Sequence, residues 1–145
     1  MSKSLKFKKS ERLHHKNLVQ TIFSKGKSVY DFPLRLVWRK LTPEELAGCY
    51  RHEVPEGIGK LQMMVTVPKR KRRHAVDRVL LRRRIREAYR LNRLPLKEMA
   101  ENDPEIGTLQ LAFVYIHTEN TDYELIERKM LRLLGKVAAE IGGRK

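Results

Sequence analysis

Cysteine, acidic residues and long apolar runs are all scarce in this chain of 145 residues. Cys49 is its single cysteine, so no internal disulfide can form, which fits a reducing cytoplasm. No apolar run approaches the ~18 residues that a membrane-spanning helix needs. The opening residues, MSKSLKFKKS, lack the apolar core of a signal peptide. We therefore expect a cytoplasmic protein without a membrane partner.

Sequence motifs for catalysis are also missing. The chain has no P-loop, no G-x-G-x-x-G element, no nucleophile elbow, and no Asp or Glu cluster suited to the two metal ions that protein nucleases commonly use. Cys49 and His52 have the spacing of half a zinc site, but there is no second half. We expect no protein-bound metal, no organic cofactor and no catalytic side chain in this protein.

Acidic residues are outnumbered: 32 Lys and Arg against 17 Asp and Glu give a net charge of +15 and a pI near 10.2. This charge favours a polyanionic partner, and without a membrane segment that partner is RNA or DNA. At 41% apolar composition, the length suits one domain with a real core. We expect a single RNA-binding domain over 1–145, with a basic flexible arm at 1–12 and a connecting loop at 41–59.

Most of the excess charge lies in residues 69–93, where twelve of 25 residues are Lys or Arg and two are acidic, a net charge of +10. Residues up to 73 resemble an extended basic arm, and a helical period begins near Ala75. The apolar positions of this helix share one face: Leu81, Ile85, Ala88 and Tyr89. The arginines of the adjacent stripe are expected to face outward: Arg82, Arg86, Arg90 and Arg93, with Arg83 at its edge and Arg78 near the apolar border.

A solvated helix usually alternates charge signs, because like charges one turn apart destabilise it. The all-arginine series at 82, 86 and 90 therefore favours a polyanion-binding face over a merely solubilising one. Arginine also suits this use, since its planar fork can contact a phosphate bidentately and stack on bases.

Periodicity predicts the other elements: helix 13–25, strands 32–40, 60–67 and 108–117, and a helix opened by a capping box at Thr121–Glu124. With the basic helix, the order α-β-β-α-β-α predicts an α+β two-layer sandwich. A helical crossover separates the last two strands, which allows parallel pairing. Residues 95–107 form another connection, whose pattern also allows a helical turn. In strand 32–40, Leu34, Leu36 and Trp38 alternate with a predicted wet face of Arg35, Val37 and Arg39.

Two separated segments carry recognisable motifs. The first leads from a strand and basic loop through Ala75-Val76 into an arginine-rich helix with the run Arg86-Glu87-Ala88-Tyr89. The second begins at Arg12-Leu13 and closes with Phe23 and Gly26. In both motifs, and in size, charge and element order over about residues 10–140, the chain resembles the bacterial ribonuclease P protein family.

The chain departs from this family at two places. Val79 and Leu80 follow Arg78 where the family usually has Asn and Arg, and Val19 stands where it often has an aromatic residue. The first departure puts an apolar side chain in the basic stripe. The spacing of Val19 and Phe23 alone favours core packing over ligand contact.

The resemblance implies a ribosomal protein S5 domain 2-like fold with an unusual left-handed β-α-β crossover, against the right-handed rule. It implies a protein cofactor that joins a large catalytic RNA to form the endonuclease that removes 5′ leaders from precursor tRNA. In the family, the RNA performs hydrolysis with bound Mg²⁺. The implied catalytic-RNA contacts are Lys69, Arg70, Lys71, Arg72, Arg73, Arg78, Arg82, Arg83, Arg86 and Arg90. The implied leader contacts are Arg12, Val19, Phe23, Arg35 and Val37.

Two other functions remain open at this point. A ribosomal or other structural RNA-binding protein of similar fold would share the arginine helix but would not need a leader site. A protein-only nuclease would cleave without an RNA partner. No obligate protein partner is evident from the residues.

Overall fold

The structure is a computed structural model, and it describes residues 7–13, 16–50, 53–54 and 57–142. Its centre is a four-stranded mixed sheet of order β1-β2-β4-β3. The strands are β1 (Lys27–Asp31), β2 (Leu34–Leu41), β3 (Leu61–Thr66) and β4 (Thr108–Tyr115). β2 pairs antiparallel with β1 and β4, whereas β3 pairs in parallel with β4. The predicted α+β class is confirmed, and the parallel pairing that the sequence allowed is present.

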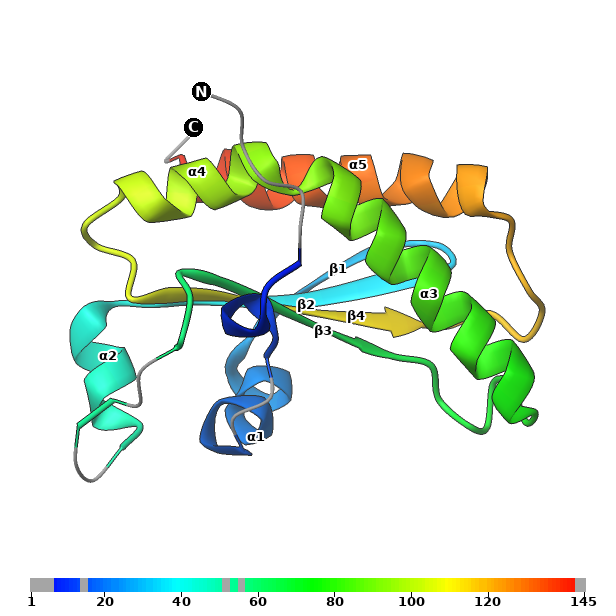
Figure 1. Cartoon of the computed structure of the whole chain (residues 1–145), viewed down its shortest axis with the longest axis horizontal. Coiled ribbons are helices and arrows are strands. Elements are labelled where there is room, and N and C mark those ends of the chain that lie inside the picture. Colours follow the sequence, from blue (N-terminus) through cyan, green and yellow to red (C-terminus); the bar gives the residue numbers. More distant parts are fainter. Residues whose placement is uncertain (1–6, 14–15, 51–52, 55–56, 143–145) are drawn as a thin grey trace.

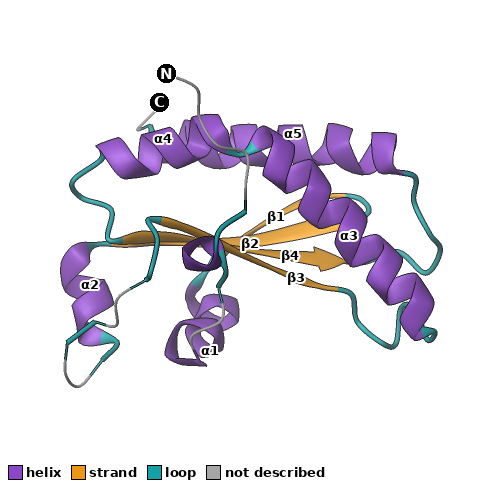
Figure 2. Cartoon of the chain, viewed as in Figure 1, coloured by secondary structure: helices purple, strands orange, loops and turns teal. Residues whose placement is uncertain are grey.

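Helices lie on both sides of this sheet (Figures 1 and 2). One side carries α3 (Ala75–Asn92), α4 (Leu94–Asn102) and α5 (Tyr123–Ile141). The other carries α1 (Lys16–Lys25) and α2 (Pro43–Gly48). The larger apolar cluster lies under α3 to α5, and a smaller one lies under α1 and α2.

The predicted inner face of α3 is confirmed, because Leu81, Ile85, Ala88 and Tyr89 are all fully buried. β4 is the strand that needs apolar residues on both faces, since helices cover it from each side. Phe113 faces the larger cluster and Ala112 faces the smaller one. The near-continuous apolar run of this segment is explained by that position.

Two elements, β1 and α2, were not predicted, and a third, α4, is longer than the helical turn that the sequence allowed. β1 is short and mostly exposed, so it depends on pairing with β2 rather than on its own burial. Residues 41–59 are not a plain loop: Leu41 ends β2, and α2 follows, with Thr42 accepting from the Glu45 N–H in a capping box. Pro95 occupies the first turn of α4, where its missing N–H costs nothing.

Three local predictions were wrong. The basic segment after β3 is a turn rather than an extended arm, since the N–H groups of Lys71 and Arg72 both donate to the Pro68 carbonyl. Part of the expected flexible arm is a 3₁₀ helix, Lys9–Glu11, whose Glu11 is buried. The N-cap of α5 is Asp122 rather than Thr121.

Gly26 sets how closely α1 approaches the sheet. A Cβ at this position would lie 2.5 Å from the Ile22 carbonyl oxygen and 2.7 Å from Cγ1 of Val37. Because the first of these atoms belongs to the backbone of the helix end, it cannot simply move aside. The glycine therefore lets α1 turn directly into β1 while it stays packed on β2.

We expect Gly26→Ala to lower the free energy of unfolding by about 1–3 kcal/mol, the usual cost of overpacking. Urea denaturation followed by circular dichroism measures this. Gly135→Ala is the matched control, because a Cβ there meets no atom within 4 Å. In the interior of α5 it should raise stability by about 0.5–1 kcal/mol. Equal effects of the two substitutions would show that the close approach at Gly26 is not needed.

Candidate nucleic-acid interface

The outward side of α3 carries a row of arginines over the larger core. Arg83 and Arg86 are exposed and Arg82 is half-buried. Val76 and Val79 are also exposed on this helix, by 78% and 40%. The buried face anchors the helix, so its basic surface is presented to solvent on a rigid element.

Several of the predicted RNA contacts also have partners within the protein. Arg72 pairs with Asp77 at 2.9 Å, and its guanidinium donates to the Thr118 carbonyl. Arg78 donates from Nη1 to the carbonyls of Arg72 and Arg73, at 2.9 and 2.8 Å. These bonds fasten the basic turn to the first turn of α3. Arg72 and Arg78 therefore shape the surface as well as charging it.

The arginines at the C-terminal end of α3 are less available for RNA contact than the helical wheel predicted. Arg90 pairs with Glu87, with Nη2 to Oε2 at 2.7 Å. Arg93 was expected on the outward stripe, and this is wrong: it is fully buried and pairs with Glu11. It follows the last residue of the helix, Asn92, and the N-terminal segment covers it. The wheel contains no information about that covering segment.

The Glu11–Arg93 pair joins the N-terminal segment to the end of α3. Nη2 of Arg93 donates to Oε2 of Glu11 at 3.0 Å, and Nζ of Lys97 lies 3.7 Å from the same oxygen. Burial alone would raise the pKa of the Glu11 carboxyl. Hydrogen bonds from Arg93 and the Lys8 N–H, with the charges of Arg93 and Lys97, outweigh it, so the pKa is lowered.

Because Glu11 is fixed, the next residue is fixed too. Arg12 forms a bridge with Met63 on the free edge of β3, and the Leu13 N–H donates to the Met63 carbonyl at 2.9 Å. Arg12 and Arg86 then line one pocket of about 230 Å³ between the N-terminal segment, β3 and α3. Burial and the nearby charges of Arg12 and Arg82 lower the pKa of Arg86. An anion in this pocket would relieve that repulsion.

The predicted leader contacts are only partly brought together. Phe23 is 42% exposed, which leaves a ring face for stacking, and Val19 is half-buried against the smaller cluster. Val37 is fully buried under α1, so it contradicts the predicted wet face of β2. Arg35 lies two residues along the same face, outside that cluster. The alternation was right, but a helix covers half of the face.

Tyr30 is a residue that the sequence analysis missed. It is 60% exposed, and the Arg35 guanidinium lies 5.8 Å from its ring centroid. Arg35 also donates to Oγ of Ser28 at 3.1 Å. Tyr30 and Arg35 are direct cross-strand partners, so they present an aromatic ring and a cation side by side. The alternation of Ser28 and Tyr30 with Val29 and Asp31 was the available signal.

Neither a metal site nor a membrane span is found in the part of the chain that the structure describes. No group of three His, Cys, Asp or Glu side chains there could hold a metal ion. His52 lies outside the described residues, and Cys49 donates from Sγ to the Glu45 carbonyl at 3.4 Å. No described helix is long and apolar enough to cross a membrane.

The chain is similar to known proteins over most of its length. Residues 7–138 match the family Ribonuclease P. A ribonuclease P protein component of Porphyromonas gingivalis is 32% identical over 133 residues, covering 92% of this chain and 87% of that protein. Another from Chlorobium phaeobacteroides is 29% identical over 135 residues, covering 90% and 86%.

Solved structures agree on the fold. The ribonuclease P protein of Staphylococcus aureus has a TM-score of 0.58 at 16% identity, covering 88% of this chain and 94% of that one. The protein from Thermotoga maritima has a TM-score of 0.58 at 21% identity, covering 87% and 96%.

Fold and surface together define a basic, nucleic-acid-binding protein of the α+β class. The match over residues 7–138 is more specific, and it shows that the chain belongs to the ribonuclease P protein family, whose members are components of an enzyme with an RNA subunit. A purely structural RNA-binding role is not favoured.

The buried pair at Glu11 predicts a pH-dependent stability. The folded-state pKa of Glu11 is lowered, so the pair stabilises fully above the unfolded pKa of about 4.3 and loses this contribution as pH falls through the folded pKa. Glu11→Gln should cost about 3–5 kcal/mol at neutral pH, because it leaves the Arg93 guanidinium buried without its counter-charge. Urea unfolding over a pH series measures both effects.

The exposed Glu101 provides the matched control, as Glu101→Gln should be nearly neutral at every pH. The difference in free energy of unfolding between wild type and Glu11→Gln should become smaller in acid, where both proteins lack the negative charge at position 11. A gap that stays constant below pH 4 would mean that packing, and not the ion pair, is responsible.

We expect Arg82→Ala and Arg86→Ala each to lower the salt slope of RNA binding by about one unit or less, as for one lost phosphate contact. Filter binding to a bacterial ribonuclease P RNA over a range of salt concentrations measures the slope. Arg128→Ala, on the exposed side of α5, removes the same charge elsewhere. Arg128→Ala should leave the slope unchanged. If Arg82→Ala and Arg86→Ala also leave it unchanged, α3 does not contact the RNA.

Proposed function

We propose that this protein binds the catalytic RNA of ribonuclease P and the 5′ leader of precursor tRNA, and so assists removal of the leader during tRNA maturation in the cytoplasm. The RNA subunit carries out the hydrolysis. The protein supplies phosphate contacts, a stacking surface and a rigid frame between the two RNAs. The observation that carries this proposal is the shared pocket of Arg12 and Arg86.

That pocket supports the proposal because it connects the two implied sites. Arg86 belongs to the row that the resemblance assigns to the catalytic RNA, and Arg12 belongs to the leader set. Both are oriented by fixed neighbours: α3 buries Ile85 beside Arg86, and Glu11 anchors the backbone before Arg12. Phosphates from two RNA strands could thus be neutralised side by side at the free edge of β3.

The leader site uses stacking more than sequence-specific contacts. An exposed aromatic ring such as Phe23 contributes ~1–3 kcal/mol per stacked base and accepts every base. Arg35 adds a cation that Tyr30 and Ser28 already orient. This combination suits leaders that differ among tRNAs. Val37, being buried, acts in this proposal by supporting α1 rather than by touching RNA.

Mg²⁺ enters this proposal as the metal of the RNA partner. It neutralises phosphates and supports hydrolysis there. The lysines and arginines of this chain take over part of the neutralising role. The protein should therefore matter most when Mg²⁺ is scarce.

The direct test is cleavage of precursor tRNA at low Mg²⁺ by a bacterial ribonuclease P RNA, with and without this protein. We expect strong stimulation, cleavage at the mature 5′ end, and no cleavage by the protein alone. Binding to the RNA without stimulation would favour a structural RNA-binding role. Cleavage without RNA would indicate a protein nuclease.

Phe23→Ala tests the leader site separately. It should weaken binding of leader-bearing substrate by about 1–3 kcal/mol, while binding of the catalytic RNA stays near normal. Leu131→Ala is the control, since Leu131 is exposed to a similar extent on α5, in the opposite helix layer. Competition between precursor and mature tRNA for the assembled enzyme measures the leader preference. An unchanged preference, with the fold intact by circular dichroism, would exclude Phe23 from the leader site.

A further inference from the structure

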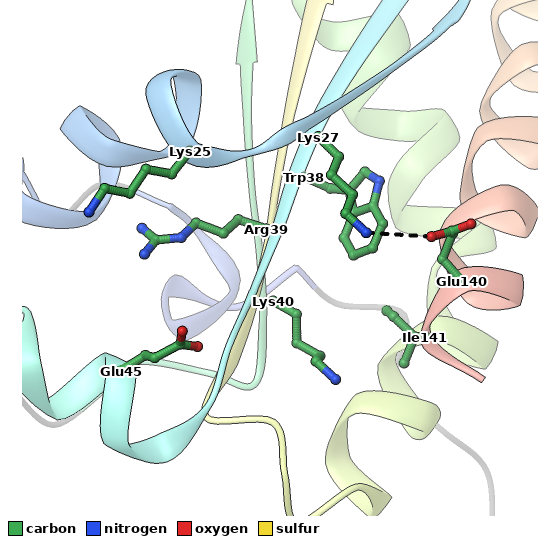
Figure 3. Close-up of a pocket in the computed structure, with 8 residues that line it drawn as sticks. All are labelled: Lys25, Lys27, Trp38, Arg39, Lys40, Glu45, Glu140 and Ile141. Atoms are coloured by element: carbon green, nitrogen blue, oxygen red, sulfur yellow. Dashed lines mark ion pairs between the residues drawn. The ribbon is translucent and has the colours of Figure 1, made fainter. Parts of the chain in front are cut away.

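A second basic pocket lies far along the chain from the arginines of α3. It has a volume of about 430 Å³ and opens where the end of α1, the end of β2, α2 and the end of α5 meet (Figure 3). Its cations are Lys25 of α1, Lys27 of β1, and Arg39 and Lys40 of β2. Neither the implied catalytic-RNA contacts nor the implied leader contacts include any of them.

One cation of this pocket is held in position from within the fold. Nη1 of Arg39 donates to Oγ1 of Thr21 on α1 at 2.8 Å. That bond occupies one of the five N–H donors of the guanidinium and leaves the planar fork able to bind an anion. Lys25 and Lys40 are exposed and extend from either side of Arg39 (Figure 3).

The two carboxylates that line the pocket already have partners. Glu45 accepts from the Thr42 N–H at 2.9 Å in the capping box of α2. That hydrogen bond, with the charges of Arg39 and Lys40, lowers the pKa of Glu45. Glu140 pairs with Lys27 at 3.6 Å. The pocket therefore keeps an excess of positive charge.

A purely structural explanation covers only part of this cluster. Lys25 is in the last turn of α1, where a cation is favoured by the helix dipole. Arg39 and Lys40 are on a β-strand and have no such explanation. Arg39 and Lys40 project to opposite sides of β2 (Figure 3), so the pocket presents cations on both sides of this strand. Cations spread in this way suit an extended anion.

α1 separates this pocket from the Phe23 surface. Leu18 and Ile22 point into the sheet. Thr21, which contacts Arg39, lies on one side of that buried line. Val19 and Phe23 lie on the other side, at the helical period of 100° per residue. The two surfaces thus occupy opposite flanks of the same helix, and one nucleotide cannot touch both.

We propose that this pocket binds the phosphodiester backbone of RNA as a second contact, on the flank of α1 away from Phe23. Arg39 provides the oriented fork, and Lys25 and Lys40 provide the flanking charges. The RNA class rests on the function proposed above. The anionic character of the ligand rests on the pocket alone. The backbone can come from the 5′ end of a leader that passes around the end of α1, or from the catalytic RNA.

The pocket contains its own reporter. Trp38 is the only tryptophan of the chain, lines the pocket, and is 5% exposed. Nζ of Lys27 lies 5.3 Å from the centroid of its ring while pairing with Glu140. A phosphate in the pocket would compete with Glu140 for Lys27 and change the field at the indole. Tryptophan emission therefore reports occupancy without any measurement of cleavage.

The experiment titrates the full chain with short single-stranded oligouridylate and follows Trp38 emission, with anisotropy of labelled RNA recording total binding. We expect a saturable change in emission. Arg39→Gln and Lys40→Gln should each weaken the emission-detected affinity about two- to fivefold, as for one exposed ion pair. Each should also lower its salt slope by about 0.7. Arg128→Gln removes one charge from α5 and should change neither.

Further titrations distinguish the sources of the backbone. A response to precursor tRNA but not to mature tRNA assigns the pocket to the leader. A response to the ribonuclease P RNA alone assigns it to the catalytic RNA. Either response supports the proposal that the pocket binds the RNA backbone.

Two results would overturn the proposal. RNA binding by anisotropy without an emission change, or equal effects of Arg39→Gln and Arg128→Gln, would reject the pocket while leaving the proposed function intact. Absence of any RNA binding would reject both.

Discussion

The interface depends on one buried ion pair between residues that are far apart in the sequence. Glu11 and Arg93 are 2% and 0% exposed, and neither charge could remain there alone. Their pairing brings the N-terminal segment against the end of α3 and the edge of β3. Arg12 follows Glu11 directly, so the position of this cation relative to α3 is determined by a bond that contacts no RNA. A structural interaction thus creates the join between the two implied RNA sites.

The basic helix is stabilised by burial of its inner face, although its outer face carries repelling charges. Its inner face buries Leu81 and Ile85, which provides the favourable energy. Its outer face repels itself, and only part of the charge is neutralised, by Asp77 and Glu87 near the two ends. In the middle of the helix, burial and the nearby charges of Arg12 and Arg82 lower the pKa of Arg86. A polyanion is the partner that removes this remaining cost.

Sequence periodicity predicted what each element buries, but not what covers it. The inner face of α3 and the double burial of β4 follow from spacing alone, and the structure confirms both. Val37 and Arg93 have patterns typical of exposed positions, yet each is covered by a segment distant in sequence. The family resemblance predicted the function and the implied contacts. It did not reveal the Glu11–Arg93 pair or the pocket around Arg39, because these depend on side chains that meet only in the folded chain.

The first turn of α3 has an apolar surface, which would affect how tightly the protein remains bound to an RNA that lies on it. Val76 and Val79 are both exposed there. Val79 stands where the family usually has Asn. Contacts of methyl groups with ribose or base faces are driven by loss of hydration, and dissolved ions do not screen them as they screen charges. Affinity contributed by this turn would persist after salt has weakened every phosphate contact. On the proposed function, the replacement of Asn and Arg by Val79 and Leu80 would exchange one phosphate contact for an apolar contact that does not depend on ionic strength.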